Sequence, residues 1–392
     1  MINIEENKKR FRQVYERYKE RIEIVPYPPE EIKKSIQIDP LNIQDITPEQ
    51  IVKQQRLKML KQKYEHTKRV VEIIEKMNIL MDNNEFFKTL SLTAGLLHDY
   101  GRFIQAVYHN CYYDAEKFYK DNGYNGHGEV GYKILFEQGE IKYFNIEEKY
   151  YKLLGPVIKY HQLRQLKDKL NLQIEPNFRE LTEKDIGLSN QYTDNDWLFI
   201  SCMIQMVKDA DMYDILYQRI INEYPLFTKR MVFNVNGMTI EEISKLTGVS
   251  IEEIKKLNNL ETENINTKKI ILPFDKVDPS ILEVPQKIKD KFFKKAYMQE
   301  NEDWDLSTMQ NDPSYNYNSI TAMWWTIGQF LGTINFTSTL QTMQQEKILE
   351  QIYNLYPDKY KYLVKEMFEF AQEELLTKRI EQNKIYAKTN LK

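Results

Sequence analysis

Histidine and aspartate residues are the part of this sequence best suited to chemistry. The chain has five histidines in 392 residues. Four of them lie on segments expected to be helical: His66, His98, His127 and His161. Asp99 follows His98 at once, and the segment VKDADMYDIL adds Asp209 and Asp211. Imidazole and carboxylate together suit Mn, Fe, Co, Ni or Zn, whereas Mg and Ca prefer oxygen ligands alone. The residue types therefore indicate a transition-metal site.

Asp99 is the natural bridge between two metal ions. The adjacent His98 lets one helix end supply a nitrogen and an oxygen ligand, and a carboxylate can bind two metals through its two oxygens. Two ions ~3.5–4 Å apart can activate a water while holding phosphate oxygens, so no serine or cysteine nucleophile is needed. Taken alone, each residue has a plainer explanation. A single histidine on an apolar helix is more often a packed core residue, and the acids can form a solvated face.

The order of these residues resembles the ligand string H, HD, H, H, D of the HD superfamily of metal-dependent phosphohydrolases. HDYGRF looks like the HDxGRF variant, HGEVGYKILF resembles an HxxxGxxIL element, and DADMYDIL looks like a DADxxD element. The HD-GYP phosphodiesterases of this superfamily carry a GYP motif and a double histidine. This chain has Tyr160 and His161 at the position of the double histidine and no GYP motif, which argues against a cyclic dinucleotide phosphodiesterase of that type.

The resemblance implies a role for each matching residue. The first metal would have the ligands His66, His98, Asp99 and Asp211. The second would have the ligands Asp99, His127 and His161. Asp209 would orient the ligands, as residues around a metal site commonly do. The expected cofactor is one or two divalent transition metal ions, drawn from Mn, Fe, Co, Ni and Zn.

Two basic residues are candidates for binding the phosphate of a substrate. Arg102 follows Asp99 by three residues, and a guanidinium can hold phosphate through two hydrogen bonds. A structural ion pair with a nearby acid is an equal alternative. Lys208 precedes Asp209 directly and is a weaker candidate of the same kind. The candidate catalytic residues are therefore Asp99, Arg102 and Lys208. His109 has no place in the string and is expected on the surface or in a pocket.

The expected fold is mainly α, an HD-domain helical bundle with a small α+β insertion. Apolar spacing and cap residues predict helices over 1–25, from Thr47-Pro48 to Met77, and over 85–98. We expect Gly101 to end the last of these just beyond the ligands. The expected division is an N-terminal helical extension (1–49), the HD core (50–229), an insert (230–275), a connector (276–317) and C-terminal helices packing on the core (318–392).

The insert has a β-α-α-β order. A strand from Val232 to Val235 leads to a turn at Asn236-Gly237, then to helices over 239–246 and 250–258, then to a strand from Lys269 to Leu272. This segment resembles LysM modules at the GxTxxxI and GVSxxEIxxLN positions. Such modules usually bind chains of N-acetylglucosamine. A recognition or assembly role inside the cell, a passive insertion and glycan binding all remain open.

Composition and charge indicate which partners and which cell compartment to expect. The net charge of −3 and the pI near 6.1 give no basic footprint for nucleic acid. The two cysteines, Cys111 and Cys202, are too few for a disulfide scaffold and are expected to be reduced. The first residues, MINIEENKKRFRQ, lack an apolar signal core, and no run of ~18 apolar residues occurs. A cytoplasmic protein with no membrane span is expected.

The sequence favours an enzyme, a metal-dependent phosphohydrolase that uses a metal-bound hydroxide on a nucleotide or another phosphoester. Its partner would be a small phosphate compound. One alternative is a mixed-valence di-iron oxygenase, because some enzymes of the HD fold use the same ligand set for oxygen. The other is a binding or scaffold protein that acts through the LysM-like insert, with a protein or glycan partner.

Overall fold

The computed structural model shows a mainly helical protein with a two-stranded sheet among its described residues. Internal contacts divide the chain into two compact units, residues 1–214 and residues 215–392. The described residues are 2–27, 47–108, 126–161, 193–218, 230–265, 267–296, 319–332, 334, 336–378 and 380.

Helices make up the described part of the first unit. Their bounds are α1 (Ile4–Ile24), α3 (Pro48–Leu80), α4 (Glu85–Leu97), α5 (Tyr100–Tyr108), α7 (His127–Tyr132), α8 (Tyr151–Tyr160) and α10 (Asp194–Gln218). Short π- or 3-10-helical turns connect α7 with α8: η1 (Lys133–Glu137), η2 (Glu140–Tyr143) and η3 (Glu148–Tyr150). The predicted helices over 1–25, 47–77 and 85–98 are confirmed to within three residues at each end.

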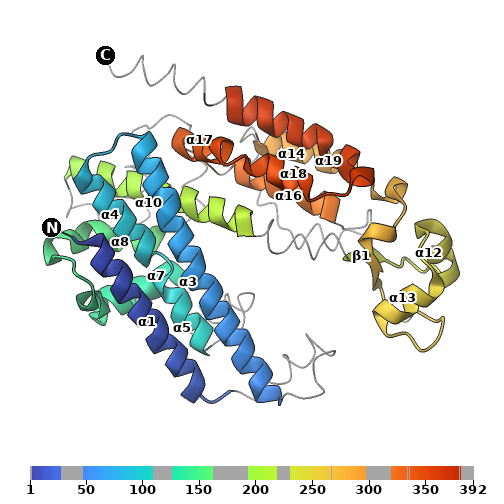
Figure 1. Ribbon diagram of the computed structural model, residues 1–392, viewed down its shortest axis with the longest axis horizontal. Helices are drawn as coiled ribbons and strands as arrows, with labels where there is room; N and C mark the ends of the chain where they lie inside the picture. Colours follow the sequence, from blue (N-terminus) through green and yellow to red (C-terminus); the bar gives the residue numbers. More distant parts are fainter. Residues whose placement is uncertain are drawn as a thin grey trace. The chain divides into compact units, whose positions relative to one another are not determined.

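The long helix α3 is the scaffold of the first unit. Thr47 caps it by accepting from the backbone of Gln50 while the Gln50 side chain bonds back to Thr47, and Pro48 opens the first turn. Val70 and Ile74 are fully buried on one face of α3, which packs against α4. Helices α1, α3 and α5 lie side by side (Figure 1). The sequence thus places His66 on a rigid, well-capped helix.

A partly buried polar network connects α1 to the rest of the first unit. The Arg17 guanidinium donates to Glu140 Oε2 at 2.6 Å and to the Tyr100 hydroxyl at 3.1 Å, and that hydroxyl donates to the same carboxylate at 2.5 Å. Tyr18 and Phe11 are buried beside it. Because Tyr100 directly follows Asp99, this network also fixes the start of α5.

The second unit combines the small sheet with more helices. Its elements are β1 (Arg230–Asn234), α12 (Ile240–Thr247), α13 (Ile251–Asn258), β2 (Lys269–Pro273), η6 (Phe274–Lys276), η7 (Pro279–Leu282), α14 (Gln286–Ala296), α16 (Ser319–Leu331), α17 (Thr337–Gln345), α18 (Ile348–Asn354), α19 (Asp358–Phe370) and η8 (Ala371–Lys378). The helix α14 lies inside the stretch expected as a connector. Its apolar residues Ile288 and Phe292 are buried, and it packs on α16.

The order β1, α12, α13, β2 matches the predicted β-α-α-β insert. The two strands pair antiparallel with Phe233 opposite Ile270, and the predicted turn residues Asn236 and Gly237 have positive φ. Asn258 donates to the Ile271 oxygen at 2.8 Å and accepts from the Ile271 nitrogen at 2.6 Å. The elements are therefore as predicted, while the likeness to LysM modules stays a prediction.

Tyr360 of α19 joins this β-α-α-β module to the C-terminal helices within the second unit. Its hydroxyl bonds to the carbonyl oxygens of Phe274 and Val277 at 2.7 and 3.0 Å, and its ring lies 4.7 Å from that of Phe274. Beyond it, Trp324 is fully buried and donates to the Leu363 carbonyl at 3.0 Å. Packing of the expected C-terminal helices on the HD core stays a prediction.

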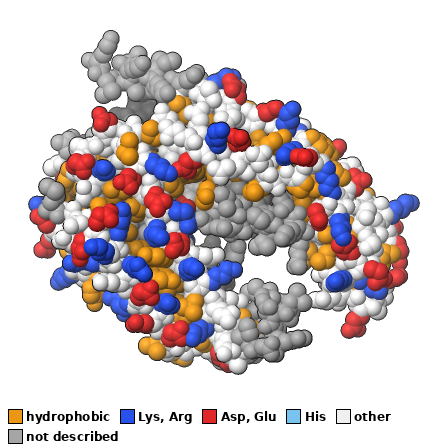
Figure 2. Space-filling view, viewed as in Figure 1, with side chains coloured by type: hydrophobic (Ala, Val, Ile, Leu, Met, Phe, Trp, Pro, Cys, Tyr) orange, Lys and Arg blue, Asp and Glu red, His pale blue; other side chains and the backbone are white. Residues whose placement is uncertain are grey.

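The face that Figure 2 shows has no large patch of a single charge among its described residues. Basic and acidic side chains are interspersed there over the described residues. Among the described helices, none combines the length and apolar character needed to cross a membrane.

Candidate metal centre

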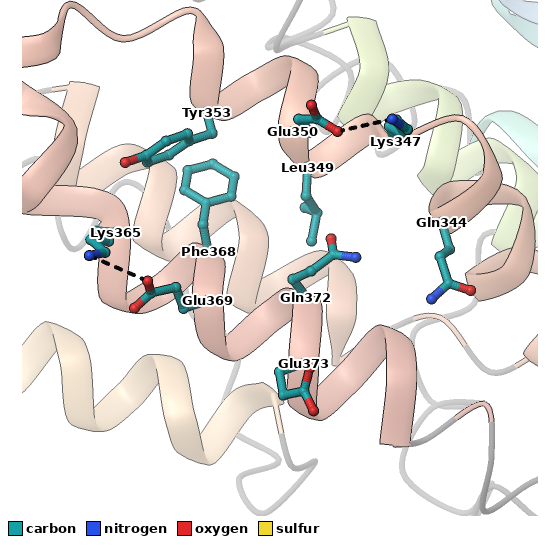
Figure 3. A pocket seen from close by; sticks show the side chains of 10 residues that line it. All are labelled: Gln344, Lys347, Leu349, Glu350, Tyr353, Lys365, Phe368, Glu369, Gln372 and Glu373. Atoms are coloured by element: carbon teal, nitrogen blue, oxygen red, sulfur yellow. Dashed lines mark ion pairs between the residues drawn. The ribbon is translucent and has the colours of Figure 1, made fainter.

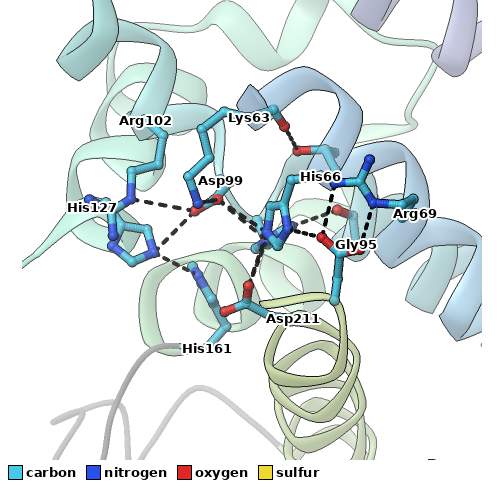
Figure 4. A network of polar contacts seen from close by, with 12 residues as sticks. Lys63, His66, Arg69, Gly95, Asp99, Arg102, His127, His161 and Asp211 are labelled. Carbon is cyan, nitrogen blue, oxygen red and sulfur yellow. Dashed lines mark hydrogen bonds and ion pairs between the residues drawn. The ribbon is translucent and has the colours of Figure 1, made fainter. Parts of the chain in front are cut away.

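Six side chains from five helical segments converge in the first unit. Figure 4 labels all of them except His98. His66 lies in the middle of α3, and Asp211 lies near the end of α10. The others sit at helix ends: His98 caps the C-terminus of α4, Asp99 follows it, His127 opens α7 and His161 caps the C-terminus of α8. All six residues predicted as metal ligands are therefore brought together.

The distances define one continuous cluster. His66 Nε2 lies 3.0 Å from Asp211 Oδ1 and 3.5 Å from Asp99 Oδ2. His98 Nε2 lies 3.7 Å from the same oxygen of Asp99. Among the described residues, three overlapping triads have ligand atoms within 4.8 Å of one another: His66–His98–Asp99, His98–His161–Asp211 and Asp99–His127–His161.

Asp99 stands at the centre of this cluster. Its Oδ2 faces His66 and His98, while its Oδ1 lies 3.1 Å from His127 Nε2. His127 Nε2 also lies 3.1 Å from His161 Nε2. One carboxylate thus has a set of imidazoles on each of its oxygens, which is the geometry that a bridging ligand needs.

Buried polar atoms at the centre fit a metal ion. The Nε2 atoms of His66 and His98 are buried and make no hydrogen bond to the described residues. A buried polar atom without a partner costs about 1–3 kcal/mol. A cation placed among these nitrogens and carboxylate oxygens would satisfy them, so the donor set suits a divalent transition metal.

The protonation states also suit metal binding. Burial lowers the pKa of His98, lowers that of His127 well below its usual range, and lowers that of His161 to about 4. Burial alone would raise the pKa of Asp99, yet the Lys63 ammonium holds it well below the usual value. At neutral pH these imidazoles are neutral and this carboxylate is charged, as metal ligands must be.

His66 and Asp211 form a tighter pair. Burial opposes protonation of His66, but the neighbouring Asp211 and Asp214 carboxylates raise its pKa overall. Against burial, the neighbouring His66 imidazole lowers the pKa of Asp211. The attraction between these two side chains holds both in place beside Asp99.

Second hydrogen bonds aim the imidazole rings. His98 Nδ1 lies 2.7 Å from the Gly95 oxygen, and His161 Nδ1 lies 2.8 Å from the Ile158 oxygen. Each carbonyl can only accept, so Nδ1 must carry the proton and Nε2 keeps its lone pair. That lone pair points into the cluster, which leaves both histidines in the tautomer that can bind metal.

Glycines let the helices that carry the ligands approach closely. A methyl group at Gly101 would overlap the backbone oxygen of His127 and lie 2.7 Å from the Gly131 nitrogen. At Gly128 it would lie 2.6 Å from the Lys159 oxygen. The prediction that Gly101 ends a helix is wrong. It lies inside α5, and its absent side chain allows backbone contact between α5 and α7.

Of the remaining predicted site residues, Arg102 has a contact with the cluster, and Asp209 and Lys208 lie on α10, the helix that carries Asp211. Arg102 donates to Gln105 Oε1 at 2.8 Å, and its Nε lies 3.9 Å from Asp99 Oδ1. Asp209 is buried on α10 and accepts from Gln205 at 2.6 Å. Lys208 is also buried on α10. His109 and Cys111 lie outside the described residues, and Cys202 is a free thiol.

Three residues at the site were not predicted. Lys63 donates to Asp99 Oδ2 at 2.7 Å. Asp214 Oδ2 lies 2.5 Å from His66 Nδ1, and Arg69 pairs with Asp214. A signal existed in the sequence, because Lys63 and Arg69 each stand three residues from His66 and so share its face of a helix.

These features define a helical domain built around a buried cluster of histidine and aspartate that can hold metal. The family model for the HD domain matches residues 64–192, and HD domains are typically metal-dependent hydrolase domains. The match covers five of the clustered residues and ends before Asp211. Asp211 belongs to the cluster because its carboxylate lies 3.0 Å from His66 Nε2. Neither the comparison with curated proteins nor the comparison with solved structures gave a match.

The second unit contains a cavity of about 640 Å³ (Figure 3). Tyr353 and Phe368 are among the residues that line it. Its charged side chains form two ion pairs, Lys347 with Glu350 and Lys365 with Glu369. It is lined by no histidine, cysteine or aspartate. Its carboxylates are those of Glu350, Glu369 and Glu373, and the first two are paired with lysines.

Proposed function

We propose that this protein is a metal-dependent phosphohydrolase that cleaves a nucleotide or another small phosphoester. The observation that carries the proposal is Asp99, whose two oxygens each face a different set of imidazoles. The ligands proposed for a first ion are His66, His98, Asp99 and Asp211. Those proposed for a second are Asp99, His127 and His161. Bound divalent ions would polarise the phosphoryl oxygens and make water acidic enough to act as a nucleophile.

The charge of the site supports an anionic substrate. The only charged ligands in the proposed set are two carboxylates, so one divalent ion balances them and a second leaves a net positive charge. Lys63 and Arg102 add two more positive charges beside Asp99. A phosphate group matches this field, and a guanidinium can bind it through two hydrogen bonds. We propose Arg102 and Lys208 for binding the substrate.

Replacing the bridge tests the proposal. Asp99→Asn keeps the side chain's shape but removes its charge, so we expect bound metal to fall and phosphate release to drop by roughly 10²-fold or more. The measurements are elemental analysis and a screen of nucleotides and phosphoesters with each candidate metal. Asp82→Asn is the matched control, because Asp82 is exposed and its positive φ of 53° tolerates asparagine. Full turnover in Asp99→Asn would contradict the mechanism.

The number of metal ions is tested on the other side of Asp99. Removing the imidazole in His127→Ala should reduce bound metal from two equivalents towards one, because the first ligand set stays intact. Unchanged stoichiometry would show that only one ion binds. Consumption of O₂ by the iron-loaded protein, without any phosphate release, would instead favour the di-iron oxygenase.

The β-α-α-β module is proposed to serve recognition. A LysM-like role with a protein or glycan partner stays a proposal for residues 230–275, as does a cytoplasmic location. Its attachment through Tyr360 supports a module held rigidly by the C-terminal helices of its unit. Pull-down with chitin oligosaccharides, compared with a Tyr360→Phe variant, tests the glycan form of this proposal.

A further inference from the structure

His66 differs from His98 and His161 in what holds the far side of its ring. Those two present Nδ1 to a backbone carbonyl, whereas His66 presents it to the Asp214 carboxylate at 2.5 Å. Asp211 of the same helix, α10, lies 3.0 Å from the opposite nitrogen. The helix α10 therefore places one carboxylate beside each nitrogen of this imidazole, and the two carboxylates are one turn apart.

Arg69 in turn fixes the Asp214 carboxylate. Its Nε donates to Oδ1 at 2.6 Å and its Nη2 donates to Oδ2 at 3.2 Å, a two-pronged pair. Asp214 is 1% exposed, so this pair is shielded from water on the carboxylate side. Arg69 stands one turn after His66 on α3, and Asp214 stands one turn after Asp211 on α10. Each helix thus supplies a ligand and, one turn on, a residue that supports it (Figure 4 shows Arg69 beside His66).

We infer that Asp214, held by Arg69, is a positioning residue that fixes the Nδ1–H tautomer of His66 and thereby sets the metal affinity of the site. The inference rests on the metal site proposed above. A carboxylate only accepts hydrogen bonds, so a neutral His66 must carry its proton on Nδ1. The lone pair of Nε2 then faces Asp99 and Asp211, where a metal would lie. Partners of this kind commonly change metal affinity by about 10–100-fold when they are lost.

Arg69 makes the outcome of Asp214→Asn predictable. An asparagine has one accepting oxygen and one donating NH₂ group, and Arg69 repels the NH₂ at either position. The contact with Oδ1 is the shorter one, so the oxygen will take that place. The NH₂ group then faces His66 Nδ1 and donates to it. The proton of His66 moves to Nε2, and that nitrogen can no longer bind metal.

Removing Arg69 should reverse this effect. In the double variant Arg69→Met, Asp214→Asn the amide is free to turn, so its oxygen can accept from His66 Nδ1 again. The single variant Arg69→Met keeps the carboxylate and should weaken binding only two- to fivefold. A purely structural role for the three residues predicts the opposite order, with the double variant weakest.

The test measures Co²⁺ affinity of the full-length protein by competition with a coloured chelator. We expect Asp214→Asn to bind about 10–100-fold more weakly than the wild type, with the double variant recovering most of that loss. Proton NMR of the Co²⁺ protein gives a second readout, because the Nδ1–H of a bound histidine appears as a shifted, exchangeable signal. One such signal should vanish in Asp214→Asn and return in the double variant. Asp82→Asn is the control.

The outcomes separate the two proposals. Wild-type protein that fails to bind Co²⁺ would overturn the proposed metal site, and this inference with it. Wild-type binding with unchanged affinity in Asp214→Asn, or a double variant weaker than Asp214→Asn, would overturn the inference alone. Should Asp214→Asn fail to fold, Arg69→Met decides, and wild-type affinity in that variant would overturn the inference.

Discussion

The two units of this protein differ in what they bury. Among the described residues, the first unit buries charged and imidazole side chains, including His66, His98, Asp99, Asp209 and Asp214. In the described part of the second unit, the buried polar side chains are one asparagine, one serine and several threonines. Within the described ranges, eight of the nine buried side-chain atoms without a hydrogen-bond partner lie in the first unit, and Ser338 carries the other.

This contrast indicates that the second unit is stabilised by apolar packing, whereas the first unit buries the charged groups of the proposed metal site. The described core of the second unit is aromatic and aliphatic, with Phe292 packed edge-on against Trp324 at 5.2 Å, so its stability comes from packing. The first unit holds charges in a dry interior, which costs free energy unless they are paired or bind metal. Its stability should therefore depend on pH and metal, while that of the second unit should not.

The largest expected effect breaks the packing of the second unit. Trp324→Ala removes a fully buried ring and should lower the free energy of unfolding of that unit by about 4 kcal/mol. Hydrogen exchange read on peptides of residues 215–392 measures the loss. Metal content should stay at the wild-type value, and loss of metal would contradict the separation of the two units.

A smaller effect should appear at the helix contact of the metal site. Gly101→Ala places a methyl group against the His127 and Gly131 backbones, so α7 must shift at a cost of about 2–3 kcal/mol. His127 moves with α7, and bound metal should fall. Gly131→Ala is the graded control, since its methyl group would meet its nearest neighbour at 3.2 Å. Equal metal content in both variants would show that the backbone contact does not set the site.

Acid should destabilise the first unit alone. Burial lowers the folded-state pKa of His98, His127 and His161, so the unfolded chain binds more protons below pH 6.5. Their contribution is present above that pH and is lost as pH falls towards 4, whereas His66, with its raised pKa, offsets part of it. We expect a loss of about 2 kcal/mol between pH 6.5 and 5 in the presence of EDTA.

All five histidines precede residue 162, which supplies the control for the acid prediction. Hydrogen exchange at several pH values, corrected for the intrinsic rate, should show the loss in peptides of residues 1–214. A similar loss in the second unit would contradict the assignment to buried imidazoles.

The smallest expected effect concerns a helix end. Thr47→Ala removes the side-chain half of the cap on α3 and should cost about 1 kcal/mol in the first unit. Because Thr47 lies more than five turns from His66, metal content should not change. Thermal unfolding in EDTA measures the cost, and a drop in bound metal would show that the site depends on the whole of α3.

Much of the site could be predicted because residue type and order carry the information. The six clustered residues are rare types in fixed order, and the cap residues Thr47 and Pro48 mark α3 in the sequence itself. The β-α-α-β order was also predictable, since alternating apolar residues and the Asn236-Gly237 turn are local signals.

The unpredicted parts depend on contacts between distant segments. Asp214 ends the DADMYD run and Arg69 stands three residues after His66, but their contact with each other joins α10 to α3 and appears only in the folded structure. Gly101 was misjudged for the same reason, because a glycine near the end of a predicted helix looks like a stop signal until the approach of α7 is known. Helix α14 was not predicted within the expected connector, because its packing on α16 through Phe292 is a contact between separate segments.

Asn258 protects the free edge of β2 from pairing with a strand of another copy of this protein. Its amide occupies both backbone groups of Ile271 on the side of β2 that faces away from β1, as a third strand would. An open strand edge invites pairing with another chain, and such pairing leads to aggregation. By filling that edge with a single side chain, the sheet stays at two strands without a long protective loop, and β2 is closed to strand exchange at its midpoint.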